Sequence, residues 1–251
     1  MTEALLADVC VLACAEAFRP DADRVVSPMG TVPRLGALLA MATFQPDLML
    51  SDGEAQVLVG PVPLGAEDAA PKSAWIPFRE VFQVVNQGRR HVMMGATQID
   101  GHGNQNISSL GDWAKPSVQL IGARGAPGNT VNHTTSYWVS NHSPRVFVES
   151  VDFVSGVGTD RPGRGPFHDL RAVVTNLAVF DLGGPAGALR LVSTHPGVTV
   201  DDVLAATGCA VHVDGDVPTT TAPDADQLAL IDHFDPRGAR FREVPRPEVD
   251  A

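Results

Sequence analysis

Residues 191–208 read LVSTHPGVTVDDVLAATG, and this stretch places a strand directly before a helix. The apolar run Leu189–Val192 has the length and composition of a short buried strand. Thr199 is the expected N-cap of the helix, Asp202 completes a capping box, and Gly208 is expected to supply a left-handed stop. A strand that leads into a capped helix is a building unit of α/β proteins, so the stretch predicts that fold class.

Elements of the same two kinds extend along the chain on both sides of this stretch. Apolar residues at helical spacing predict helices over about 2–18, 32–43 and 224–234. Apolar runs predict strands at residues 48–50, 56–59, 90–95, 118–122, 145–151, 172–180 and 189–192. Several of these runs are continuous rather than alternating, which is typical of strands covered on both faces.

We therefore predict a single α/β domain over residues 1–251, with an open mixed sheet flanked by helices. Two segments are expected outside its core: a Pro-rich surface excursion at 60–77 and a loosely ordered tail at 242–251.

Composition argues against several classes of protein. The net charge of −11 argues against a protein that grips nucleic acid through its overall field. No apolar run is long enough to span a bilayer and the first residues are not basic, so a cytoplasmic protein with no membrane contact is expected. Cys10, Cys14 and Cys209 lack the spacing of metal ligands and are expected to be buried reduced thiols.

Polar loops between the predicted elements hold the candidate chemistry. The loop IGARGAPGN at 121–129 follows a predicted strand, and its glycines let backbone N–H groups approach an anion or oxyanion closely. Arg124 in this loop is either exposed on the surface or aimed into a cleft. The turn QIDGHGNQN at 98–106 carries His102, expected to be solvated, and Asn104 and Asn106, expected to bond the local backbone.

Three further histidines lie in or near polar loops. His133 and His142 lie in the polar segment 129–145, where a Ser–His–acid triad stays open although no G-x-S-x-G motif precedes a serine, and where a metal site would lack a third ligand at a suitable spacing. His195 precedes the helix of the opening stretch, where a packing or capping role is expected.

Four segments, taken together and in this order, resemble the beta subunits of class I CoA-transferases: PDLMLSDG at 46–53, MGATQIDGHGNQNIS at 94–108, LIGARGAPG at 120–128 and the stretch at 191–208. The resemblance covers about residues 5–236. It implies an open α/β sheet flanked by helices. It also implies a similar alpha subunit as partner, with the active site between the two subunits.

Two positions depart from the transferase pattern. In that family a glutamate two residues before a glycine is the nucleophile, and alignment on Gly53 puts Ser51 in its place. Asp52 stands where Asn or Ser is usual, and Glu54 comes three residues too late; because successive strand side chains point to opposite faces, a shifted carboxylate does not replace the missing one. Arg124 stands at a position that is commonly glycine, and its permanent charge suits a developing oxyanion or enolate.

Both departures resemble a narrower group, the beta subunits of the actinobacterial hydrolase that opens the last ring of a degraded steroid. The segments SDGEAQ at 51–56, RGAPGN at 124–129 and SYWVSNH at 136–142 carry this closer match. It implies retro-Claisen hydrolysis of a cyclic keto-acyl-CoA, an α2β2 heterotetramer and a catalytic glutamate on the alpha subunit. No cofactor is implied, because CoA enters with the substrate.

This resemblance assigns a role to each candidate site residue. Arg124 is the expected catalytic residue, stabilising negative charge. The expected substrate contacts are Ser51, Asp52, Gly53, Asn106, Gly122, Ala123, Gly125 and Asn129. Two alternatives stay open: a genuine CoA-transferase with a substituted nucleophile such as Asp52 or Glu54, and a non-catalytic scaffold subunit.

Overall fold

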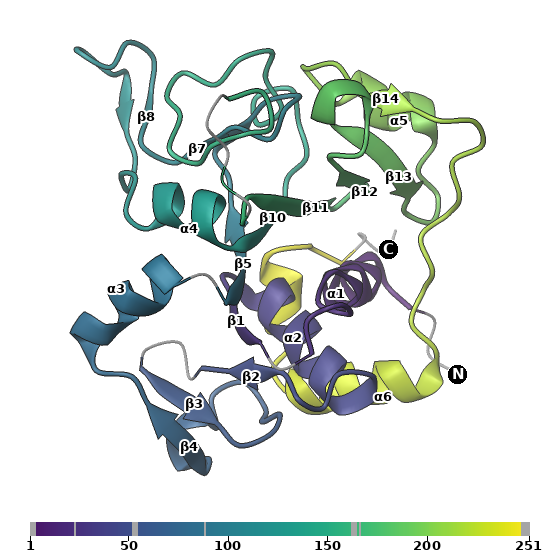
Figure 1. The fold of residues 1–251 in the computed structure, drawn as a ribbon. Coiled ribbons are helices and arrows are strands. Elements are labelled where there is room, and N and C mark those ends of the chain that lie inside the picture. Colours follow the sequence, from purple (N-terminus) through teal and green to yellow (C-terminus); the bar gives the residue numbers. More distant parts are fainter. Residues whose placement is uncertain are drawn as a thin grey trace.

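An eight-stranded sheet forms the centre of the computed structural model, which describes residues 4–22, 24–51, 55–87, 89–161, 165 and 167–246 (Figure 1). The strand order is β14-β13-β12-β11-β10-β5-β1-β2. Their bounds are β1 Val25–Pro28, β2 Met49–Leu50, β5 Arg90–Gly95, β10 Thr134–Val139, β11 Asp169–Thr175, β12 Ala178–Asp181, β13 Arg190–Thr194 and β14 His212–Val213. The five strands from β2 to β11 are parallel, β12 is antiparallel to both of its neighbours, and β14 is parallel to β13. The predicted mixed α/β sheet is confirmed.

Helices and loops cover both faces of the sheet. One face packs against α1 (Leu6–Ala17), α2 (Thr31–Thr43) and α6 (Ala225–Phe234), and the other against a second core that includes residues of α4 (Ala126–Asn132) and α5 (Val200–Ala205). Within β10, Trp138 belongs to the first core and Tyr137 to the second. Burial on both faces explains the continuous apolar runs of these strands.

Smaller elements lie outside the main sheet. They are three two-stranded ribbons, one helix and three 3-10 turns: β3 Gln56–Leu58 with β4 Lys72–Trp75, β6 Gln98–Ile99 with β7 Gln105–Asn106, β8 Ser109–Leu110 with β9 Val118–Gln119, α3 Phe78–Gln87, η1 Glu67–Ala69, η2 Pro185–Gly187 and η3 Ala239–Arg242. The excursion at 60–77 leaves the sheet as predicted, but it contains η1 and β4.

The sequence prediction missed the central strand β10 and treated 129–145 as a polar loop. Thr134, Thr135 and Ser136 open this strand and are buried. Their hydroxyls bond to neighbouring elements: Thr134 to Asp169 (2.8 Å), Thr135 to the carbonyl of Asn129 (3.2 Å) and Ser136 to His91 (2.9 Å). Buried polar side chains are tolerated in a strand when they are hydrogen-bonded in this way.

Two predicted strands were also wrong. Residues 145–151 form turns with a single bridge between Phe147 and Ile99. Residues 172–180 form not one strand but the hairpin of β11 and β12, because the Thr175 hydroxyl accepts hydrogen bonds from the N–H groups of Leu177 and Ala178 (3.0 Å each) and turns the chain.

The opening stretch folds as predicted at its start and differently at its end. Thr199 caps α5, and Asp202 bonds back to the Thr199 N–H group (2.9 Å). Gly208 does not supply a left-handed stop: it is absent from the residues with positive φ. A Cβ there would lie 2.3 Å from the carbonyl oxygen of Phe147, so close backbone approach is the reason for glycine.

The predicted loose tail is ordered over its first residues. Val244 is buried, and the Glu243 carboxylate accepts hydrogen bonds from the Thr31 and Val32 N–H groups (2.6 and 3.2 Å) at the start of α2. The Trp138 indole also donates to Glu243 (2.9 Å). Residues 247–251 lie outside the described part of the chain.

Candidate active site

Ser51 stands at the carboxyl end of β2, where the transferase glutamate is expected. It is half-buried and forms an antiparallel bridge with Val57, and its carbonyl accepts a hydrogen bond from Arg34 (3.1 Å). Arg34 in turn pairs with Glu67 (3.3 Å). Asp52, Gly53 and Glu54 lie outside the described residues, and their roles stay predictions.

The loop at 122–125 joins β9 to α4 and keeps a glycine-type backbone. Gly122 has φ +87°, and its N–H group donates to the Ile107 carbonyl (3.1 Å). Arg124 has φ +46°, and Ala186 is the other non-glycine residue in the described part of the chain with positive φ. This conformation is disfavoured for a side chain with a Cβ atom by about 1–2 kcal/mol. The chain therefore holds an arginine in the conformation of a glycine.

Arg124 is presented outward from this loop. Its side chain is exposed, and its Nε–H group donates to the carbonyl of Ile121 (3.3 Å). The Ala123 carbonyl accepts a hydrogen bond from the Ala126 N–H group (2.9 Å), and Gly125 is the N-cap of α4. The exposed guanidinium is free to meet a ligand or a second subunit that approaches this end of the sheet.

The two asparagines among the expected substrate contacts are buried and engaged within the fold. Asn106 donates to the Gln98 side chain and to the Ser109 carbonyl (2.7 Å each). Its amide oxygen accepts from the N–H groups of Ser108 and Ser109 (2.9 and 3.3 Å). Asn129, on α4, accepts from Arg90 and donates to the sulfur of Met94. A direct contact of either residue with substrate stays a prediction.

The structure thus brings most of the predicted residues together around one loop. Gly122, Ala123, Arg124, Gly125 and Asn129 are contiguous with the start of α4, and Asn106 is adjacent through the Gly122–Ile107 hydrogen bond. Ser51 lies two strands away from β5, at the edge of the sheet.

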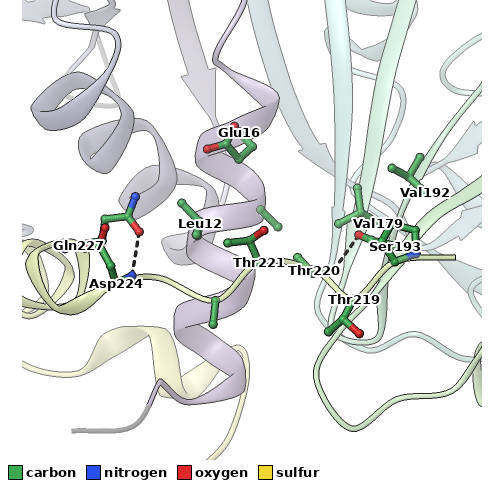
Figure 2. Close-up of a pocket in the computed structure, with 13 residues that line it drawn as sticks. Leu12, Glu16, Val179, Val192, Ser193, Thr219, Thr220, Thr221, Asp224 and Gln227 are labelled. Atoms are coloured by element: carbon green, nitrogen blue, oxygen red, sulfur yellow. Dashed lines mark hydrogen bonds between the residues drawn. The ribbon is translucent and has the colours of Figure 1, made fainter. Parts of the chain in front are cut away.

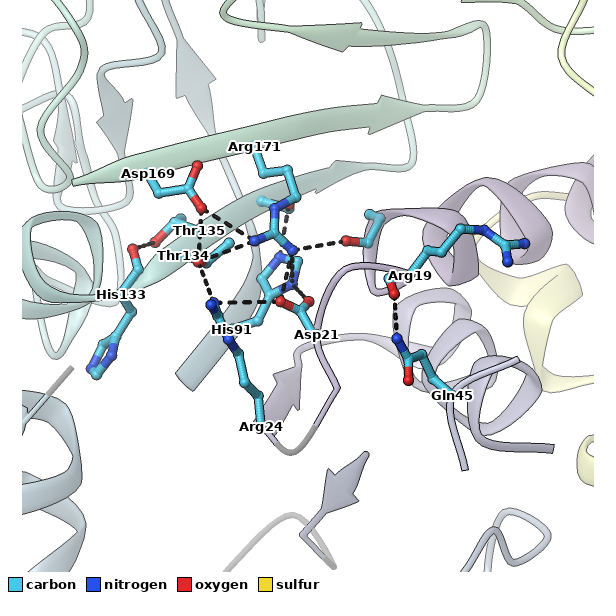
Figure 3. Close-up of polar contacts among 12 residues, drawn as sticks. Arg19, Asp21, Arg24, Gln45, His91, His133, Thr134, Thr135, Asp169 and Arg171 are labelled. Carbon is cyan, nitrogen blue, oxygen red and sulfur yellow. Dashed lines mark hydrogen bonds and ion pairs between the residues drawn. The ribbon is translucent and has the colours of Figure 1, made fainter. Parts of the chain in front are cut away.

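A Ser–His–Asp arrangement is present, but in the interior of the molecule. Figure 3 shows its His91 and Asp21. His91 bonds to Asp21 through Nδ1 (2.5 Å) and to Ser136 through Nε2 (2.9 Å), and all three are fully buried. Arg171 donates to the other oxygen of Asp21 (2.8 Å). No substrate reaches this serine, so the arrangement ties the chain after α1 to β5, β10 and β11.

The environment fixes the charges of this cluster. Burial alone would raise the pKa of the Asp21 carboxyl, but hydrogen bonds and charge from His91 and Arg171 hold that pKa below its usual range. Burial lowers the pKa of His91 in spite of its bond to Asp21. At neutral pH we therefore assign an ionised Asp21 and a neutral His91.

Two further histidines, His142 and His195, are placed in structural roles. Burial lowers the pKa of His142 to about 4, and its ring stacks on Phe147. The expected packing role of His195 is confirmed: it is fully buried and bonds to Thr220 and to the Thr175 carbonyl (3.0 and 2.8 Å). Across the described ranges, no three His, Cys, Asp or Glu residues are grouped to hold a metal, and no helix is long and apolar enough to cross a membrane.

A cavity of about 670 Å³ lies apart from the predicted site, between α1, the β12–β13 hairpin and residues 218–227 (Figure 2). Leu12, Glu16, Val179 and Thr221 are among its lining residues. None of the expected substrate contacts lines it. A smaller cavity of about 290 Å³ lies at the carboxyl ends of β5 and β10 and includes Glu243.

Sequence reasoning missed Arg90, the first residue of β5. This arginine is buried, and it bonds to Asn129 directly behind the loop that carries Arg124. An arginine at the head of an apolar run was the available signal, but such a residue is more often at the solvated end of its strand.

Comparison with known proteins agrees with this arrangement. The chain is 49% identical over 249 residues to the cholesterol ring-cleaving hydrolase IpdB subunit of Rhodococcus jostii, covering 97% of this chain and 98% of that protein. The chain belongs to the IpdB family. The crystal structure of Rhodococcus jostii IpdAB superimposes with a TM-score of 0.92, at 49% identity over 97% of this chain and 99% of that one.

The IpdB family lies within a wider group of CoA-transferase subunits. The B component of the 3-oxoadipate CoA-transferase of Pseudomonas knackmussii is 31% identical over 83% of this chain and 85% of that protein. No family model matches the chain. The resemblance to CoA-transferase beta subunits and to the ring-opening hydrolase subunit, expected from the sequence, is confirmed.

Proposed function

We propose that this chain is the B-type subunit of a heteromeric hydrolase that opens the last ring of a steroid-derived cyclic keto-acyl-CoA. One observation carries this proposal: Arg124 occupies a glycine conformation in the loop beside α4. In addition, Ser51 stands at the position where a transferase needs its glutamate. Membership of the IpdB family supports it. A transferase mechanism requires a carboxylate at position 51, and serine does not form the acyl anhydride on which CoA exchange depends.

The reaction is a retro-Claisen cleavage in which the atoms of one water molecule are added across a carbon–carbon bond. A carboxylate base takes a proton from water as its oxygen adds to the ring ketone. The tetrahedral adduct then collapses to a carboxylic acid, and the electron pair of the broken bond passes to the carbon next to the thioester, as an enolate. That carbon finally takes the proton back from the base.

Arg124 supplies electrostatic stabilisation in this scheme. Its guanidinium is permanently charged, and its terminal N–H groups, apart from the Nε–H group that donates to Ile121, are the donors for the oxygen on which negative charge develops. Preorganised donors of this kind contribute about 3–4 kcal/mol to the transition state. The backbone N–H groups of residues 123–125 add weaker donors to the same oxygen, whereas the Gly122 N–H group is bound to the Ile107 carbonyl.

The base belongs to the partner. The B-type chain pairs with a homologous A-type subunit, as in the IpdAB structure, and we propose that a glutamate of that subunit activates the water. We further propose an α2β2 assembly that acts in the cytoplasm without a resident cofactor, because the CoA group arrives with the substrate.

The test is reconstitution of this chain with a homologous A-type subunit. Turnover of a cyclic keto-acyl-CoA in ¹⁸O-labelled water is expected to place one labelled oxygen in the new carboxylate. Arg124→Ala is expected to lower kcat by about 10²–10³-fold, and Arg124→Lys is expected to restore only part of it. Near wild-type turnover by Arg124→Ala, or trapping of an acyl-enzyme on this chain with hydroxylamine, would refute the proposal.

A further inference from the structure

Arg90 is a buried cation that has no acidic partner among the residues that the structure describes. Its side chain is 9% exposed at the start of β5. Its two terminal nitrogens donate to neutral groups, Asn129 Oδ1 and Ser27 Oγ, the second at a long 3.4 Å. The Nε–H group is enclosed and has no acceptor within the described residues. No ion pair to Arg90 is found in that part of the chain.

Other enclosed arginines of the molecule are neutralised by acids. Arg240, which is 5% exposed, pairs with three aspartates, Asp8, Asp232 and Asp235 (2.8, 2.6 and 3.1 Å). Arg171 pairs with Asp21 and Asp169. Burying an unpaired ion is strongly unfavourable, so Arg90 is the exception that needs a physical reason.

The register of the strands shows where the guanidinium points. Val25 of β1 pairs with Arg90, and Ser27 lies two residues farther toward the carboxyl edge. Because Arg90 reaches the Ser27 hydroxyl, its side chain extends toward that edge. Its bond to Asn129 places it on the face of the sheet covered by α4.

Ser51 and the glycine loop share this face. Val26 and Leu50 are register partners and both pack into the core with α1 and α2. The next residues of the two strands, Ser27 and Ser51, therefore project to the opposite face. Asn129 lies against Gly125 on its other side: a Cβ on Gly125 would be 3.6 Å from the Asn129 amide nitrogen. Arg90 thus lies on the same face of the sheet as Ser51 and the loop of Arg124.

We infer that Arg90 binds a carboxylate that enters the site from outside this chain. This inference rests on the proposed function, since it assigns the anion to the proposed active site of Ser51 and Arg124. The position where the transferase family carries its own carboxylate is a serine here, so the chain does not supply that charge at position 51. Burial lowers the pKa of Arg90 to about 10, and the group stays cationic at neutral pH. The carboxylate comes either from the acyl group of the substrate or from the A-type subunit.

Two binding experiments on the reconstituted heteromer separate these sources. The first compares glutaryl-, adipoyl- and pimeloyl-CoA with the unbranched fatty acyl-CoA of the same length by titration calorimetry. If the substrate supplies the anion, at least one dicarboxylic ester binds about tenfold more tightly than its match, and Arg90→Met abolishes this preference. The second measures the affinity between the subunits; if the partner supplies the anion, Arg90→Met weakens assembly by a similar factor and the wild type shows no such preference.

Thermal unfolding of this chain distinguishes anion binding from a structural role. Replacing an unpaired buried cation with an apolar side chain is expected to leave the Tm unchanged or raised. Arg171→Met, which removes the nearer of the two arginines that pair with Asp21, is the matched control and is expected to lower the Tm. The inference is overturned if Arg90→Met lowers the Tm as Arg171→Met does, or if neither ligand preference nor subunit affinity changes. Because neither assay needs turnover, failure of the proposed hydrolysis leaves these readouts intact.

Discussion

Arg124 combines a local penalty with a proposed chemical role. A left-handed backbone suits glycine, yet the chain keeps an arginine there with its charge exposed beside α4. Strain that persists in a loop is often retained at sites where a side chain must be held in one direction. The same reasoning predicts that stability and activity respond in opposite directions at this residue.

Arg124→Gly is expected to keep the free energy of unfolding unchanged or to raise it by up to about 1 kcal/mol, because the relief of strain offsets the greater freedom of glycine in the unfolded chain. Activity of the heteromer is expected to fall by about 10²–10³-fold. Denaturant unfolding and steady-state kinetics measure the two effects. Ala186→Gly, at the other strained position, is the control: it is expected to match the stability change and to leave activity alone. A destabilised Arg124→Gly variant would contradict this view of the loop.

At the scale of elements, β10 shows where sequence patterns lose their power. Apolar spacing located β5, α2 and α6, and the capping box of Thr199 and Asp202 located the start of α5. The row Thr134–Ser136 looked like a loop, since the hydroxyls of Thr134 and Ser136 find partners 35 and 45 residues away in sequence. The residues around Arg124 were predictable from a motif, whereas Arg90 was not, because the absence of an acidic partner among the described residues is known only from the folded molecule.

Ser136→Ala tests the role of this row. The ionised Asp21 only accepts, so His91 donates from Nδ1 and its Nε2 must accept the Ser136 proton. Removing the hydroxyl leaves a buried acceptor without a donor, and the free energy of unfolding is expected to fall by about 1–3 kcal/mol. The half-buried Ser140, just beyond the end of β10, serves as control, with an expected change below about 0.5 kcal/mol for Ser140→Ala. Equal effects of the two substitutions would remove the case for a structural hydrogen bond.

For the molecule as a whole, the buried histidines predict weak resistance to acid. Burial lowers the pKa of His91, His142 and His195, so the unfolded chain binds more protons than the folded one as the pH falls below about 6.5. His142, with a pKa of about 4, alone accounts for a loss of about 2 kcal/mol between pH 7 and pH 5. Asp21 adds to the loss at still lower pH, because its folded pKa is also depressed.

Urea unfolding at pH 7, 6 and 5 measures this dependence. His142→Gln keeps a polar side chain of similar size that does not titrate near neutral pH. This substitution is expected to reduce the loss in the free energy of unfolding between pH 7 and pH 5 by about 2 kcal/mol. A stability that is constant from pH 7 to pH 5 in the unaltered chain would contradict the assignment of neutral buried imidazoles.

The contact between Glu243 and the start of α2 also bears on how the chain is made. The carboxylate that satisfies the Thr31 N–H group follows it by 212 residues in the sequence, and the buried pair of Arg240 with Asp8 spans 232. A ribosome adds about 5–20 residues per second, so Arg240 and Glu243 are synthesised about 10–40 s after α1 and α2. Until these partners are made, α1 and α2 expose apolar surface that is prone to aggregation. We therefore expect the nascent chain to need a chaperone until synthesis is complete.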